Sequence, residues 1–140
     1  MDIYEATQTL LQSAVPADVN VSAFVLTYDS EVGKFLLPDF PAVTYNYQGM
    51  TPVIAHDCSS SLYRVALDIE VWGDLEQIAK NAKLVSDAIN AKRITVNNVE
   101  FTLVINDSRD IMELELDFKR RYMRFVGLVQ VEEGHGEASL

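Results

Sequence analysis

Residue types that could supply a nucleophile and a base stand together in one short segment. His56, Asp57 and Cys58 are consecutive, and serines follow at 59–61. Hydrolytic enzymes activate a serine or cysteine with a neighbouring base, which such a segment contains in principle. Residues adjacent in sequence seldom reach catalytic geometry, however, and no Gly-x-Ser-x-Gly elbow accompanies them. We interpret the segment as a polar loop, and we expect no catalytic residues and no enzymatic activity.

Closely spaced carboxylates are a second group that could do chemistry. Asp68 and Glu70 lie two residues apart in a segment with the alternating pattern of a strand, so both side chains should point to the same side. Such a pair can share a proton or a metal ion. Arg64 falls on the same side and supplies a cation, which favours a solvated sheet face over a metal site.

Metal-ligand spacing is weak elsewhere in the chain. Asp107, Asp110 and Glu113 resemble a calcium loop only loosely, because no glycine occupies the required turn. The two histidines, His56 and His135, have no partners at zinc-like spacing. No glycine-rich phosphate loop occurs. We therefore expect neither a metal nor a cofactor.

The charge balance is strongly acidic, with a formal net charge of −10. The densest basic cluster is Lys119-Arg120-Arg121 with Arg124, and we interpret it as balancing the acidic residues just before it, Glu113, Glu115 and Asp117. A nucleic-acid groove needs clustered cations that release counterions, and this chain has few. An acidic surface repels DNA, so we expect no specific DNA binding.

Length and composition indicate one domain. We expect a single folded unit over 1–132 and a flexible, Gly- and Glu-rich tail over 133–140. The only cysteine is Cys58, which excludes an intrachain disulfide and fits a reducing cytoplasm. The chain shows neither a signal-peptide pattern at its start nor an apolar run of the roughly 18 residues that a membrane helix requires. We expect a protein that is made and kept in water, with no membrane partner.

Two amphipathic helices frame the predicted elements. The first covers about 3–14, with Asp2 as its N-cap and Glu5 at the capping-box position. The second follows Asp74, with Gln77 at the box position, and continues to about Asn90. Both carry an apolar stripe at helical spacing.

Alternation and turn residues predict the strands. The expected extended segments are 22–28, 34–37, 42–48, 63–71, 94–96, 99–105 and 122–131. Asn97-Asn98 should form a two-residue hairpin turn. Loops are expected at 49–61 and 106–110, and 111–117 suits either a short helix or a strand.

Apolar residues exceed what two helices can cover in an isolated molecule. The last strand is apolar on both sides, and the 49–61 segment keeps apolar residues in polar company. Self-association would bury this surplus. The residues expected at an interface are Met50, Val53, Ile54, Tyr122, Arg124, Val126 and Leu128.

The order of elements resembles the tail terminator family of long-tailed bacteriophages, also called tail completion or minor tail protein U-like. The likeness rests on the Phe40-Pro41 to Tyr47 stretch, on the strand ending in Val71-Trp72 with the capped helix after it, and on the closing strand from Arg121 to Val131. The elements and the resemblance together predict an α+β fold: a mixed, mainly antiparallel sheet of about four to six strands packed against two helices.

The resemblance implies a non-enzymatic virion protein, assembled in the host bacterial cytoplasm. Such proteins form a ring, hexameric in the family, that caps the head-proximal end of the tail tube and stops its polymerisation. Its partners would be other copies of the chain, the tail tube protein and the head connector or neck protein. DNA would pass through the ring without specific binding. From the negative charge of the chain, we take Asp68 and Glu70 as candidates for residues that face the lumen.

Two other interpretations stay open. A head-closure or adaptor protein is also a small ring subunit at the same junction. A homodimeric binding module belongs to a different class, and it would show a two-fold interface and a well-formed pocket.

Overall fold

The computed structural model describes residues 2–23, 27–31, 33–36, 38–53, 60–113 and 118–132. The elements are α1 (Ile3–Ala14), β1 (Asn20–Ala23), β2 (Thr27–Asp29), β3 (Lys34–Leu36), β4 (Ala42–Val53), β5 (Ser60–Trp72), α2 (Leu75–Ile89), β6 (Lys92–Val96), β7 (Val99–Glu113) and β8 (Phe118–Glu132). Predictions about Ile54, His56 to Ser59, segment 114–117 and the tail 133–140 lie outside the described residues.

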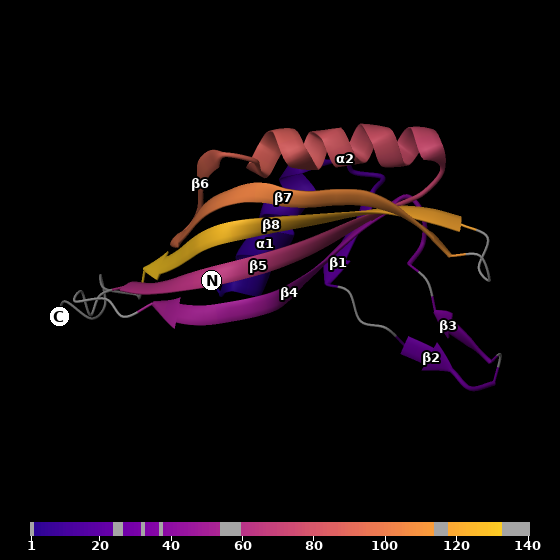
Figure 1. The fold of residues 1–140 in the computed structure, drawn as a ribbon, viewed down its shortest axis with the longest axis horizontal. Helices are drawn as coiled ribbons and strands as arrows, with labels where there is room; N and C mark the ends of the chain where they lie inside the picture. Colours follow the sequence, from indigo (N-terminus) through magenta and orange to yellow (C-terminus); the bar gives the residue numbers. More distant parts are fainter. Residues whose placement is uncertain are drawn as a thin grey trace.

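The main sheet contains six strands in the order β1-β4-β5-β8-β7-β6. Only β1 runs parallel to its neighbour, β4, and all other pairs are antiparallel. The long strands twist together along the molecule, with α2 beside β7 and α1 behind the strands (Figure 1). The predicted α+β class, with a mainly antiparallel sheet against two helices, is confirmed.

Both helices begin where the sequence predicts. The carboxylate of Asp2 accepts a hydrogen bond from the backbone N–H of Glu5 at 2.7 Å. Asp74 and Gln77 form the complete capping box at the start of α2, with each side chain bonded to the other's backbone N–H. These bonds satisfy N–H groups that a helix leaves unpaired in its first turn. The predicted two-residue turn at Asn97-Asn98 is also confirmed, with Asn97 at a φ of 52°.

The hydrophobic core lies between the helices and one face of the sheet. Alternate residues of β5 and β8 line this face, and the apolar stripes of α1 and α2 cover it. Its largest fully buried aliphatic and aromatic side chains include Leu11, Leu67, Ile69, Ile89, Phe101, Leu103 and Phe125. Within the described residues, no helix is long and apolar enough to cross a membrane.

The predicted loop at 49–61 is wrong at both ends. β4 continues to Val53 and β5 already begins at Ser60. Gly49 and Pro52 look like turn residues in the sequence. Gly49 instead follows a register shift after Tyr47, and Pro52 lies in a part of β4 that pairs with β5 only. An edge position tolerates proline because no ladder N–H is needed there.

The predicted loop at 106–110 is also wrong, because β7 continues through it to Glu113. A register shift between Ile105 and Asp107 places an irregularity in the strand, and pairing with β8 then resumes. The polar residues that suggested a loop are cross-strand partners of β8. Asp107 lies opposite Arg124, and Asp110 lies opposite Arg121.

Candidate interaction surface on the open sheet face

The helices cover one face of the sheet, and we call the opposite side the open face. It consists of the alternate strand residues that point away from the core. Its central members are Thr51, Arg64, Ala66, Asp68, Glu70, Thr102, Val104, Asp107, Arg109, Tyr122, Arg124, Val126 and Leu128, placed by strand register. One end of this face is polar and aromatic, and the other end is small and apolar.

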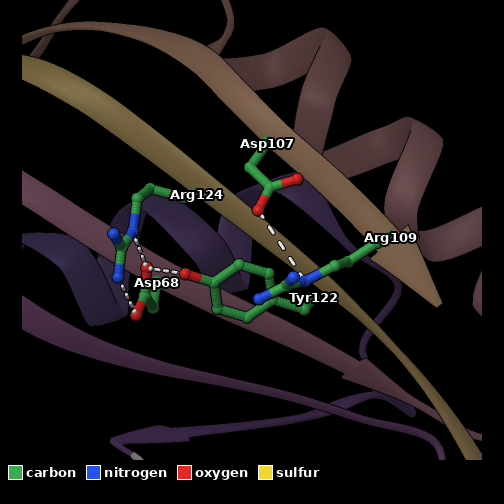
Figure 2. Close-up of polar contacts among 5 residues, drawn as sticks. All are labelled: Asp68, Asp107, Arg109, Tyr122 and Arg124. Carbon is green, nitrogen blue, oxygen red and sulfur yellow. Dashed lines mark hydrogen bonds and ion pairs between the residues drawn. The ribbon is translucent and has the colours of Figure 1, made fainter. Parts of the chain in front are cut away.

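Asp68 is the centre of the polar end (Figure 2). Its carboxylate accepts hydrogen bonds from Arg124 Nε at 2.7 Å and Nη2 at 3.1 Å, so the pair is bidentate. The hydroxyl of Tyr122 donates to the same carboxylate at 2.8 Å. Only 10% of the Asp68 side chain is exposed. A buried carboxylate is costly unless it is paired, and these three bonds supply that pairing.

Tyr122 links this pair to β7. The guanidinium of Arg109 lies 5.1 Å from the centroid of the Tyr122 ring, within cation–π distance, and 3.7 Å from a carboxylate oxygen of Asp107. Burial and the hydrogen bond to Asp68 raise the pKa of Tyr122 to about 12. The hydrogen bond and charge of Asp68 raise the pKa of Arg124 as well. Tyr122 therefore stays protonated and Arg124 stays charged at neutral pH.

A second ion pair continues the polar end. Arg120 Nε lies 2.9 Å from Glu70 Oε2, and both side chains are more than four-fifths buried. The Arg120 guanidinium also lies 5.1 Å from the centroid of the Trp72 ring, on which Phe40 stacks at 6.0 Å. The indole N–H donates to Thr44 Oγ1 at 2.9 Å. This end of the open face is filled by its own side chains.

Three arginines of the basic cluster form ion pairs across strands. Arg120, Arg121 and Arg124 pair with Glu70, Asp110 and Asp68 respectively. The predicted balance with Glu113, Glu115 and Asp117 involves side chains outside the described residues. The cations that pair with Asp68 and Glu70 are therefore on the neighbouring strand β8, whereas the sequence had indicated Arg64 on the same strand.

The apolar end of the open face contains a groove of about 600 Å³. Small residues on β4 and β5, Gly49 and Ala66, form its floor, and Val126 and Leu128 on β8 form its wall together with Thr51 and Arg64. Beside it, Val104 is 47% exposed and Leu128 is 39% exposed. These uncovered apolar side chains make this end of the open face a candidate interaction surface.

The structure brings part of the predicted interface together. Val126 and Leu128 line the groove, while Tyr122 and Arg124 belong to the polar end of the same face. The side chain of Met50 points to the opposite, helix-covered face of the sheet, where it packs against the core. Val53 ends β4 on the open face, opposite Leu62.

Sequence reasoning missed Ala66, Gly49 and Val104 as members of this surface. Leu103, Val104 and Ile105 form an apolar run within a strand, so the middle residue must point away from the core. That run is the signal that could have identified Val104. The depression at Gly49 and Ala66 depends on strand register, which the sequence does not display.

The other chemical candidates do not form a site in the described residues. Asp107 and Asp110 lie three apart on β7 and so point to opposite faces. Within the described part of the chain, no three His, Cys, Asp or Glu side chains cluster closely enough to hold a metal ion. His56, Asp57, Cys58 and His135 lie outside that part.

Comparison with known proteins finds similarity to solved structures and no match to a family model or a curated protein. Among solved structures, the chain is similar to a chain of the "Virion of native gene transfer agent (GTA) particle" with a TM-score of 0.44 and 13% sequence identity. The alignment covers 87% of this chain and 84% of that chain. At this level the similarity transfers no function.

Proposed function

We propose that this chain is a non-enzymatic virion assembly protein of the tail terminator kind. Copies close into a hexameric ring at the head-proximal end of the tail tube, stop the tube from growing, and present a different surface to the head connector. The mechanism is steric and interfacial, because a closed ring occupies the position that the next ring of tube subunits would take.

The observation that carries this proposal is the one-sided covering of the sheet. α1 and α2 pack on the same face, and the apolar end of the other face keeps an open groove with Val104 and Leu128 exposed beside it. Covering each of these two half-exposed side chains would contribute about 1 kcal/mol. Repeated at every interface of a ring, this contribution favours self-association.

The polar end of the open face suits the lumen of such a ring. Asp68 and Glu70 lie at this end, and each is mostly buried and paired with an arginine of β8. A paired carboxylate attracts few counterions, and a paired arginine is not free to bind phosphate. The pairing of these charges and the net charge of −10 together give a surface along which DNA can slide without specific binding.

The experiment that tests the proposal measures tube length. Tail tube subunits from the same virus are allowed to polymerise with increasing amounts of the chain, and tube lengths are measured by negative-stain electron microscopy. We expect shorter tubes that carry a ring at one end. Unchanged lengths at a molar excess of the chain would contradict the terminator assignment. Unchanged lengths together with binding to the head connector would favour the head-closure or adaptor function.

A homodimeric binding module is the second candidate, and the groove volume favours it, since ligand sites range from roughly 300 to 1,000 Å³. The groove is lined from one sheet face only, by residues of β4, β5 and β8. A ligand there would stay uncovered on its outer side, whereas binding sites usually bury most of their ligand. This geometry fits a protein partner better than a small molecule.

A further inference from the structure

Tyr4, in the first turn of α1, separates two depressions on the surface of the molecule. The first has a volume of about 440 Å³, and Tyr4 lines it together with Glu5, Gln8, Thr9 and Tyr45. The second has a volume of about 320 Å³, and its lining includes Asp2, Tyr4, Met50, Tyr63 and Val131. Each depression therefore combines two tyrosines with one carboxylate, and we call the two together the Tyr4 site.

The ring of Tyr4 is held in place and is still accessible. Its centroid lies 5.4 Å from that of Tyr47 in an edge-on contact and 6.3 Å from that of Tyr45. Gln8 is also fixed, because its Oε1 accepts from the Tyr45 hydroxyl at 2.8 Å and its Nε2 donates to the backbone oxygen of Val21 at 2.7 Å. Tyr4 is nevertheless 43% exposed. The walls of the first depression are therefore preorganised, which lowers the entropic cost of binding a ligand there.

Acids surround the Tyr4 site, and cations are scarce there. α1, β1 and β4 contain no lysine or arginine, and Lys34 is the only residue of either type before Arg64. The Arg64 side chain lines the groove on the open face, on the opposite side of the sheet from Tyr63. Among the described residues, no ion pair joins Asp2 or Glu5 to a lysine or arginine. The two carboxylates thus carry a negative charge that a cationic ligand would balance.

We infer that the Tyr4 site binds lysine or arginine side chains from a basic segment of a partner protein. A cation is attracted to the face of a tyrosine ring and to a carboxylate beside it. The long alkyl stem of such a side chain can pack on Met50 and Val131 in the second depression while its charged end reaches Asp2. The inference goes beyond the proposed function and does not depend on the ring, because the site lies at α1, on the helix-covered side of the sheet.

A blocked peptide with two arginines, acetyl-Gly-Arg-Gly-Arg-Gly-amide, probes the site in the unmodified chain. The matched control peptide has citrulline in place of both arginines, since citrulline keeps the shape of arginine and lacks its charge. In heteronuclear NMR titrations, the arginine peptide should shift the amide signals of Tyr4, Glu5 and Gln8 in a saturable way and bind about tenfold more tightly than the control peptide. Equal affinities of the two peptides, or no saturable shift of these signals, would overturn the inference.

Substitutions that keep the helix cap test which groups attract the cation. Asp2→Asn combined with Glu5→Gln removes both charges, and asparagine still caps a helix. This double variant should bind the arginine peptide about fivefold more weakly, and Tyr4→Leu should bind it about threefold more weakly. The matched double variant, Glu76→Gln with Asp87→Asn, changes the net charge by the same amount on α2 and should leave the affinity unchanged. An equal loss in both double variants would show a nonspecific attraction to an acidic protein and would overturn the inference.

The mass of the assembled chain separates this inference from the proposed function. In light scattering, the variant with Asp2→Asn and Glu5→Gln should form the same assembled species as the unmodified chain, because the Tyr4 site is not part of the open face. Loss of that species would assign the Tyr4 site to contacts between copies and would overturn the inference of a different partner. A monomeric unmodified chain that still prefers the arginine peptide would contradict the ring and support the Tyr4 site.

Discussion

Asp68 and Arg124 lie directly opposite each other on β5 and β8, and the guanidinium binds the carboxylate through two nitrogens at 2.7 and 3.1 Å. This pair separates the two ends of the open face. On one side lie the other polar and aromatic side chains, and on the other side the face continues into Ala66 and Val126 and the apolar groove. The pair therefore joins the two central strands at the boundary of the proposed interface.

Removing the arginine should destabilise the fold. Arg124→Ala leaves Asp68 with Tyr122 as its only hydrogen-bond donor among the contacts in Figure 2, in a position that is 10% exposed. We expect a loss of about 2 kcal/mol in the free energy of unfolding, measured by urea denaturation. The control is Lys83→Ala, which breaks the exposed pair of Lys83 with Asp87 on α2 and should cost less than about 0.5 kcal/mol. Equal effects of the two variants would contradict a structural role for the Asp68 pair.

Tyr122 should ionise late in an alkaline titration. Its pKa is raised to about 12, by burial first and then by the hydrogen bond to Asp68. Because the folded pKa exceeds the unfolded value near 10, the contribution to stability is complete below pH 10 and is lost as the pH rises through 12. The absorbance difference between the unmodified chain and Tyr122→Phe isolates this tyrosine. A midpoint near 10 in the folded protein would show that the environment of Tyr122 is described wrongly.

Gly127 should tolerate no side chain. Its φ is +153°, and an added Cβ would lie 2.1 Å from the backbone oxygen of Thr102 on the neighbouring strand. Gly127→Ala should therefore lower stability by about 3 kcal/mol or prevent folding, as thermal unfolding would show. Gly49→Ala is the matched control, since a Cβ there meets no atom within 4 Å, and its effect should stay within about 1 kcal/mol. A Gly127→Ala chain as stable as this control would contradict the close approach of β7 and β8.

The capping box of α2 should contribute measurably to stability. Asp74→Ala removes the acceptor for the Gln77 N–H, a bond of 2.8 Å, and should cost about 1 kcal/mol. Asp87→Ala on the exposed side of the same helix removes a carboxylate without a capping role, and it serves as the comparison. If both changes cost the same, the cap contributes nothing specific.

The elements that could be predicted from sequence are those with local signals. Asp2, Asp74 and Gln77 mark helix starts because capping acts within one turn, and Asn97 marks a hairpin because its left-handed φ is needed at that residue. Each signal lies within a few residues of the structure that it specifies, so no knowledge of distant neighbours is required.

The candidate surface could be predicted only in part, because it depends on strand register. Val126 and Leu128 were found because the strand they belong to is apolar on both sides. The partners of Arg120 and Arg124 come from β5, about fifty residues away in sequence, and no local rule identifies them. The continuation of β7 through Asp107 was missed for the same reason, since the residues opposite its polar positions come from β8.

The most direct test of the central claim is the mass of the assembled protein. Light scattering of the purified chain over a range of concentrations and divalent-ion conditions should give a closed species of six times the 15.7 kDa chain mass. Leu128→Asp places a charge at the groove wall and should shift that species to the monomer without loss of thermal stability. A chain that stays monomeric under every condition, or a stable dimer that ignores Leu128→Asp, would contradict the claim that copies associate through the open sheet face.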